Sequence, residues 1–82
     1  MKLILDIETN GFLDVLDKIH CMVFKDIETQ KVYSYNPNQI NDGLNLLKKA
    51  TLIIGHSIMG FDLPAIEKVT GYKYEGEILD TL

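Results

Sequence analysis

The feature that most constrains the fold is an apolar run near the N-terminus that ends in acidic residues. Residues 3–8 read LILDIE, apolar at first and then alternating, and Asn10-Gly11 breaks the pattern. An apolar run that gives way to alternation and stops at a turn signal predicts a β-strand over residues 2–8. Because its first half is apolar at consecutive positions, we expect both faces of this strand to be buried at the centre of a sheet.

Two further stretches predict more strands beside it. Residues 19–25 and 31–35 are rich in β-branched and aromatic side chains, and the polar segment DIETQ between them predicts an antiparallel hairpin. Residues 51–54 read TLII and predict a fully buried strand. Because a helical crossover would precede it, we expect this strand to run parallel to the first.

Helix signals surround that strand. Asn36 and Gln39 are spaced to form a capping box around Pro37, which predicts a helix reaching Lys48-Lys49. Ile40, Leu44 and Leu47 would form its apolar stripe. Residues 61–70 predict a second helix, with Pro64 in its first turn, Ile66 and Val69 facing inward, and Gly71 as its C-terminal cap. The final Asp80-Thr81-Leu82 predicts the start of a third helix.

Composition limits what such a chain can do. With 82 residues, 46% of them hydrophobic and 24% charged, the chain fits one modest globular domain. Its 12 acids, 8 lysines and complete lack of arginine argue against strong non-specific DNA binding unless bound cations meet the phosphates. No apolar run is long enough to cross a membrane, the start does not resemble a signal peptide, and the single Cys21 fits a reducing compartment, so a cytoplasmic protein is expected.

The acids of the first strand suggest a metal site. Asp6 and Glu8 are two residues apart, so they share one face, about 6.6 Å apart along the strand. Asp62 follows the strand at 51–54, and acids at the C-terminal ends of parallel strands can converge at one edge. Close carboxylates repel unless a divalent cation neutralises them. The plainer alternatives remain open: strand-end acids in solvent for the first pair, and a helix cap for Asp62 and for Asp80.

The tetrapeptide Asp-Ile-Glu-Thr occurs twice, at residues 6–9 and 26–29. The first copy follows an apolar run that should fix its backbone in the sheet, whereas Lys25 and Lys31 flank the second in a predicted hairpin turn, so only the first can hold a rigid site. Asp26 and Glu28 belong to the second copy and are expected in a solvated turn. His20 and His56 are expected to be structural residues.

Longer motifs resemble a known family. LDIETNG resembles the first motif of the DEDD-family 3′–5′ proofreading exonucleases, and GHSIMGFDLPAIEK resembles their second, in the form found in phage A-family DNA polymerases. KIHCMVFKDIETQKVYSY is similar to the hairpin of those enzymes, and ILDTL is similar to the segment after the second-motif helix. The resemblance spans essentially all 82 residues, with the motifs in the family's order.

The resemblance implies a truncated ribonuclease H-like α/β fold: a three-stranded antiparallel unit plus one parallel strand, with two helices. It implies hydrolysis of the terminal phosphodiester at a single-stranded DNA 3′ end by two Mg²⁺ or Mn²⁺ ions. Asp6 would bridge the ions, Glu8 would bind the metal that carries the attacking water, and Asp62 would hold the second ion. The residues expected near the substrate are Thr9, Asn10, Phe12 or Leu13, Ser57 and Phe61. Many relatives have asparagine at the position of Ser57, so contacts to the strand are expected to be weaker.

Residues 1–82 would be a single partial domain, because the family's third motif, a Tyr or His followed four residues later by an Asp, has no counterpart here. One metal ligand would therefore be missing, and the isolated chain is expected to be nearly inactive unless a polymerase domain or a second chain completes it. The alternative is a small stand-alone phage protein that uses the same fold as a non-catalytic module for binding protein or nucleic acid. In either case, an exposed sheet face is expected to favour self-association. A third alternative is an α/β fragment whose acids only cap helices and end strands.

Overall fold

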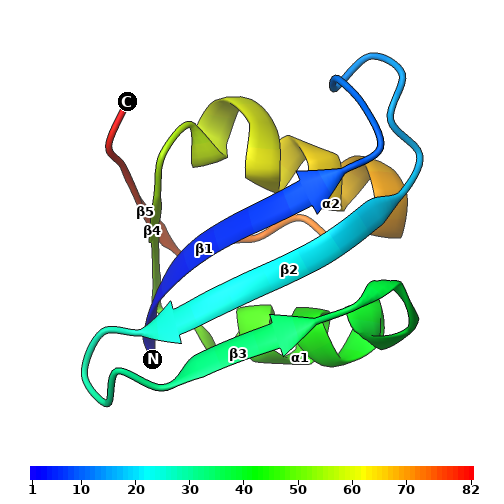
Figure 1. Ribbon diagram of the computed structural model, residues 1–82. Coiled ribbons are helices and arrows are strands. Elements are labelled where there is room, and N and C mark those ends of the chain that lie inside the picture. The colour runs from blue at the N-terminus through cyan, green and yellow to red at the C-terminus, as the bar shows by residue number, and fades with distance from the viewer.

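Five strands form one mixed sheet in the computed structural model, which describes all 82 residues. Along the sheet their order is β3-β2-β1-β4-β5, and both helices lie behind this sheet in Figure 1. The strands are β1 (Lys2–Thr9), β2 (Ile19–Asp26), β3 (Val32–Tyr35), β4 (Leu52–Gly55) and β5 (Glu77–Asp80). The molecule therefore has two layers, and one face of the sheet carries no helix.

The N-terminal strand β1 is central, as predicted, but only one of its faces is buried. Leu3, Leu5 and Ile7 point into the core, while Ile4 on the other face is 40% exposed. The prediction of burial on both faces was wrong because the helices that cover β1 all lie on one side. The same one-sided burial holds for β4, in which Ile53 is fully buried and its neighbour Ile54 only partly.

The predicted hairpin of β2 and β3 is antiparallel, as expected. Asp26 differs from its prediction, because it is the last residue of β2 and is buried rather than solvated. Its carboxylate accepts hydrogen bonds from the backbone N–H groups of Glu28 and Thr29, at 2.8 and 3.3 Å. Asp26 thus closes the turn of the hairpin as an Asx turn.

The first helical segment begins with a 3₁₀ turn, η1 (Pro37–Gln39), which leads into α1 (Ile40–Lys49). The predicted capping box is present: the Asn36 side chain accepts from the Asn38 N–H, and the Gln39 side chain accepts from the Asn36 N–H. Leu44 and Leu47 are buried. The 3.6-residue spacing therefore identified the core-facing side of this helix correctly.

The second helical segment begins three residues earlier than predicted. A turn of π-helix, η2 (Ile58–Asp62), precedes α2 (Leu63–Thr70), and Ser57 before it adopts a left-handed backbone conformation with φ 57°. Ile66 is buried and Gly71 ends the helix with φ 79°, both as predicted. A π-helical turn widens the backbone ring and shows no distinctive residue pattern, so sequence periodicity does not indicate one.

The C-terminal segment is a strand and not the start of a third helix. Strand β5 pairs in parallel with β4, in the register that sets Ile53 beside Ile78 and Ile54 beside Leu79. Asp80 caps a different segment from the one predicted: its carboxylate accepts hydrogen bonds from the N–H groups of Ser57, Met59 and Leu82. The prediction failed because an Asp suited to capping can also serve a turn distant in sequence.

The architecture is thus a five-stranded mixed α/β sheet with helices on one face. The predicted parallel pairing of β1 and β4 is confirmed. The predicted set of strands was one short, since β5 was not anticipated. Neither helix is long and apolar enough to span a membrane.

Gly55 provides a test of how tightly β4 meets its surroundings. A Cβ atom at this position would contact the Ile58 side chain and would lie 2.8 Å from the carbonyl oxygen of Leu5. Backbone cannot yield easily, so Gly55→Ala should lower the free energy of unfolding by about 1–3 kcal/mol. Urea denaturation measures this change. The control Gly60→Ala meets no atom within 4 Å, and its stability should stay within about 1 kcal/mol of the parent. Equal effects of the two substitutions would contradict the assignment.

Candidate metal centre

The candidate site lies where β1 loses its neighbour. Along β1, strand β4 pairs with Lys2, Leu3 and Ile4 only, so the second half of β1 has no strand on that side. The backbone N–H of Ile7 instead donates to Oδ2 of Asp62, at 3.2 Å in a buried position. Because an unpaired buried N–H is costly, this hydrogen bond fixes the Asp62 carboxylate against β1 beside the position of Asp6 and Glu8.

The two acids of β1 lie on the uncovered face of the sheet. Asp6 and Glu8 are exposed, and they alternate with the buried Leu5 and Ile7. Two residues of strand separate them by about 6.6 Å along the chain axis. The structure therefore places both carboxylates on the same side of the sheet, as the sequence predicted.

Asp62 is an electrostatically strained member of this group. Its side chain is 5% exposed, and burial is the largest cause that raises its pKa from 3.8 to about 6. The negative charge of Asp6 raises the pKa further, whereas the Ile7 N–H lowers it. A buried carboxylate next to a second carboxylate favours either a proton or a cation in the space between them.

The helix-cap alternative for Asp62 does not match the structure. Asp62 is the residue before α2, but its side chain makes no capping hydrogen bond to that helix. The segment that carries Asp62 is held by other groups. Asp80 accepts from the backbone of η2, while Gly55 accepts from the N–H and the hydroxyl of Thr81. Asp80 is thus a positioning residue whose role sequence analysis missed, although the apolar pair Ile78-Leu79 before it is a weak strand signal.

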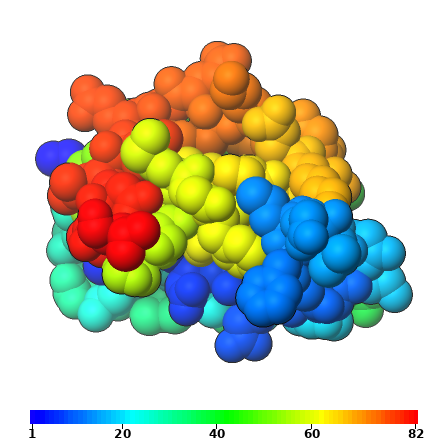
Figure 2. Space-filling model, turned by 90° about the horizontal axis from the view of Figure 1, so that it is seen from above, coloured from blue at the N-terminus to red at the C-terminus, as the bar shows by residue number.

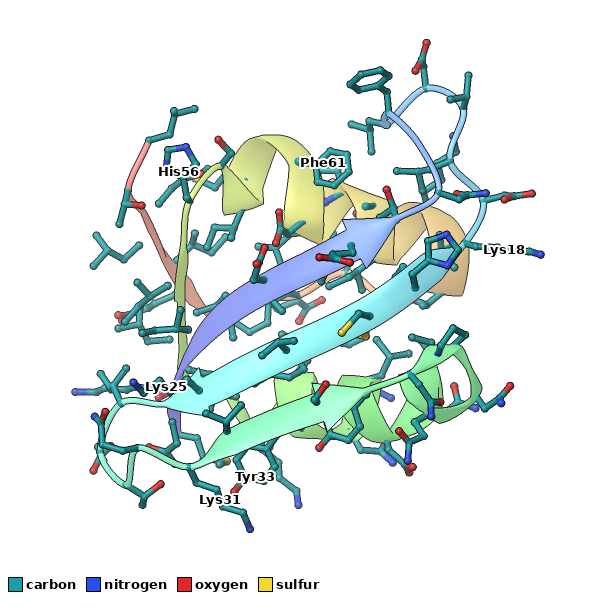
Figure 3. All side chains as sticks on the ribbon, viewed as in Figure 1. Lys18, Lys25, Lys31, Tyr33, His56 and Phe61 are labelled. Atoms are coloured by element: carbon teal, nitrogen blue, oxygen red, sulfur yellow. The ribbon has the colours of Figure 1, made fainter.

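Several of the expected substrate residues surround this end of the sheet. Phe12 is 83% exposed in the loop between β1 and β2, and Phe61 packs partly against the core. Figure 3 shows Phe61 beside the tip of β1 and His56 on the opposite side of η2, toward the C-terminus. From above, η2 in yellow lies between the light-blue loop after β1 and the red C-terminal residues (Figure 2).

Thr9 and Asn10 have structural roles in that loop. The Thr9 hydroxyl donates to the carbonyl oxygen of Gly11 at 2.7 Å. The Asn10 side-chain oxygen accepts from the N–H groups of Asp17 and Lys18, and its amide donates to the Asp17 carboxylate. These contacts close the loop that presents Phe12. The backbone N–H of Ser57 donates to the Asp80 carboxylate, and its hydroxyl makes no capping hydrogen bond to η2.

The carboxylates of Asp6, Glu8 and Asp62 are of the type that binds hard divalent cations, but they do not form a complete set of metal ligands. Carboxylate oxygens are the ligands preferred by Mg²⁺ and Mn²⁺. No three His, Cys, Asp or Glu side chains lie close enough together to form a ready site. Asp6 and Asp62 interact electrostatically, while Glu8 adds a third carboxylate on the same strand face. His20 and His56 join no metal-ligand cluster.

Comparison with known proteins gives two relatives of one kind. The chain is 34% identical over 79 residues to a DNA-directed DNA polymerase of Enterobacteria phage T3, and 32% identical over 76 residues to that of Escherichia phage T7. The chain is similar to a segment of phage DNA polymerases. The matches cover 92% and 88% of the chain but only 11% of each polymerase. No protein-family model matches the sequence.

The raised pKa of Asp62 predicts a stability effect with a definite sign. The folded chain holds this proton up to about pH 6, whereas the unfolded chain loses it near pH 3.8, so the stability contributed by Asp62 falls as the pH rises between these values. Asp62→Asn removes the charge and keeps an oxygen for the Ile7 N–H. In EDTA at pH 7.5 it should raise the free energy of unfolding by about 1–2 kcal/mol, after allowance for solvent screening.

At pH 4 the gain from Asp62→Asn should shrink toward zero, because the parent carboxyl is then mostly protonated. Urea titrations at both pH values measure the difference. The control Asp14→Asn changes an exposed loop acid and should show no such pH dependence. A loss of stability in Asp62→Asn at pH 7.5 would rule out a strained carboxylate.

Proposed function

We propose that the chain supplies metal-binding carboxylates to the 3′–5′ exonuclease portion of a phage-type DNA polymerase. The observation that carries this proposal is the hydrogen bond from the Ile7 N–H to Asp62, which holds an acid from η2 beside the acids of β1. The similarity to polymerases of phages T3 and T7 supports the link to a polymerase. The strand order β3-β2-β1-β4-β5, with β4 and β5 parallel to β1, supports a ribonuclease H-like fold.

In this proposal Asp6, Glu8 and Asp62 would hold Mg²⁺ or Mn²⁺. Bound metal ions would supply an activated water and would stabilise the departing 3′ oxygen of the scissile phosphodiester. The chain's own contribution is to hold its carboxylates in place before metal binds. Asp62 is fixed by Ile7, and Asp6 and Glu8 are fixed by the ladder of β1 with β2. Burial first and then the charge of Asp6 raise the pKa of Asp62, and a cation between these two carboxylates would offset both costs.

The substrate class follows from the surface beside the acids. Phe12 presents an exposed aromatic ring that could stack on the terminal base of a single strand, as aromatic side chains do in many single-strand sites. Thr9 and Asn10 shape the loop that carries this ring, and Phe61 and Ser57 border the site on η2. With a net charge of −4 and no arginine in the chain, bound metal ions would supply positive charge to meet the phosphates.

The chain spans about a ninth of the polymerases that it matches, so the activity of a whole enzyme is part of the proposal. A complete site of this class needs a fourth acid, which would come from another segment or chain. A second candidate function is a non-catalytic binding module, favoured by the uncovered sheet face and by the lack of a ready three-donor cluster. Metal-dependent trimming of single-stranded DNA distinguishes the enzyme from the module.

The duplicated tetrapeptide offers a matched test of metal binding. The double variant Asp6→Asn with Glu8→Gln should weaken Mn²⁺ binding at least tenfold, because it removes two of the three ligands. The control Asp26→Asn with Glu28→Gln makes the same chemical change in the second copy and should bind Mn²⁺ like the parent. Paramagnetic broadening of backbone amide signals reports both affinity and location. Equal Mn²⁺ affinity in both variants would overturn the metal-site proposal.

Phe12 gives a test of the substrate proposal. Because its ring is 83% exposed, Phe12→Ala should leave the free energy of unfolding within about 0.5 kcal/mol of the parent. Loss of one stacked base should weaken binding to single-stranded DNA by about 1–3 kcal/mol. Fluorescence anisotropy with an end-labelled oligonucleotide in Mg²⁺ measures this. Val15→Ala alters an exposed residue of the same loop and serves as control. Unchanged DNA affinity in Phe12→Ala would remove Phe12 from the site.

A further inference from the structure

The loop between β1 and β2, residues 10–18, has an ordered tip that carries Phe12. The carbonyl oxygen of Phe12 accepts hydrogen bonds from the N–H groups of Val15 and Leu16, at 3.0 and 2.9 Å. Leu16 is 1% exposed, so its side chain anchors this turn in the core. The backbone that carries Phe12 is therefore a closed turn, while the aromatic ring itself is exposed.

A lysine of α2 reaches the tip of this loop. The Nζ atom of Lys68 donates a hydrogen bond to the carbonyl oxygen of Leu13, at 2.8 Å. The other hydrogen bonds of residues 11–16 stay within the loop or go to Thr9 at the end of β1. Figures 1 and 2 show the loop beside α2. Because Leu13 follows Phe12 directly, the bond from Lys68 fixes the backbone next to the aromatic ring.

The base of the loop is not closely packed against α2. A hollow of about 430 Å³ is lined by Asp17 and Lys18 at that base and by Val69 of α2, together with residues of β2 and of the first helical segment. Apolar packing therefore does not join the loop to α2 along its whole length. Lys68, the neighbour of Val69 in α2, supplies a polar connection at the tip.

Lys68 also stands on the helical segment that carries Asp62. Asp62 is the last residue of η2, and α2 begins at the next residue. The hydrogen bond from the Ile7 N–H holds Asp62 against β1, and the hydrogen bond from Lys68 holds the loop against α2. One continuous segment of the chain thus contacts both the candidate metal centre and the turn that presents Phe12.

We propose that Lys68 is a positioning residue that sets the distance between the Phe12 ring and the acids of the candidate metal centre. The base of a 3′-terminal nucleotide would stack on Phe12 while its phosphodiester lies at the metal ions, so the spacing of ring and acids decides whether both contacts form together. This inference rests on the proposed function. It adds that the spacing depends on one hydrogen bond between the loop and α2.

Two substitutions of Lys68 separate its hydrogen bond from its bulk and charge. Lys68→Met keeps a long unbranched side chain but removes the donor, whereas Lys68→Arg keeps both a donor and the charge. Without DNA, Lys68→Met should loosen the loop, so the Leu16 amide should exchange its hydrogen about threefold faster or more. Lys68→Arg should exchange like the parent. Because Lys68 is exposed, circular dichroism of both variants should match that of the parent.

Binding of single-stranded DNA in Mg²⁺ tests the positioning role. The probe is an oligonucleotide with a fluorescent adenine analogue either at its 3′ end or several nucleotides upstream. Lys68→Met should bind about three- to tenfold more weakly and lose the quenching of the 3′-terminal analogue, while the upstream analogue keeps its signal. Lys68→Arg should restore both properties. The control Lys49→Met removes the same charge from the exposed end of α1 and should bind like the parent.

A double variant decides whether Lys68 acts through Phe12. Phe12→Ala with Lys68→Met should bind DNA no more weakly than Phe12→Ala alone, because the lysine serves only to place the ring. A lysine that contacts a phosphate directly would instead give additive losses and would lower the salt-dependence slope by about one. Additive losses, or binding and loop exchange of Lys68→Met that equal those of the parent, would overturn this inference alone. A parent that binds no DNA, or Phe12→Ala that binds like the parent, would overturn the proposed substrate site and this inference with it.

Discussion

The candidate site depends on one backbone group that loses its strand partner. Strand β1 pairs with β4 for only three residues, and the N–H of Ile7 beyond them must bond to something else. The Asp62 carboxylate accepts this hydrogen bond, which draws a buried acid to the edge of the central strand. If β4 continued along β1, its own carbonyl groups would take that position and η2 could not approach. The shortness of β4 is therefore a condition for Asp62 to reach the backbone of β1.

Contacts on both sides of Gly55 fix the point at which the chain leaves β4 and turns away from β1. A side chain at that position would collide with Ile58 and approach the Leu5 carbonyl, so the close turn requires glycine. Ser57 then adopts a left-handed conformation, and Asp80 from β5 accepts its N–H. These contacts link β5, the turn at residues 55–57 and η2 into one support for Asp62. Asp80 therefore joins the C-terminal strand to the candidate metal centre by hydrogen bonds, and Ile78 of the same strand packs against the core.

Most of the sheet and helices follow from local sequence patterns, and the failures share a cause. The capping box at Asn36, the amphipathic stripe through Leu47 and the cap at Gly71 each arise from neighbours in sequence, so they were predictable. The third helix expected at Asp80 was wrong because two of the three N–H groups that this acid binds belong to residues 57 and 59. The prediction that both faces of β1 are buried was wrong. Apolar side chains favour burial, but the placement of the helices decides which face of the sheet is covered.

The sequence by itself determined that Asp6 and Glu8 share a strand face, because residues two apart on a strand must do so. It also determined that the second Asp-Ile-Glu-Thr copy differs in context, since Lys25 and Lys31 flank it in the segment between two predicted strands. Only the tertiary structure decided that Asp62 meets the backbone of β1 and not the helix it precedes, and that burial raises its pKa. Those outcomes depend on contacts 55 residues apart, and local pattern carries no information about such distances.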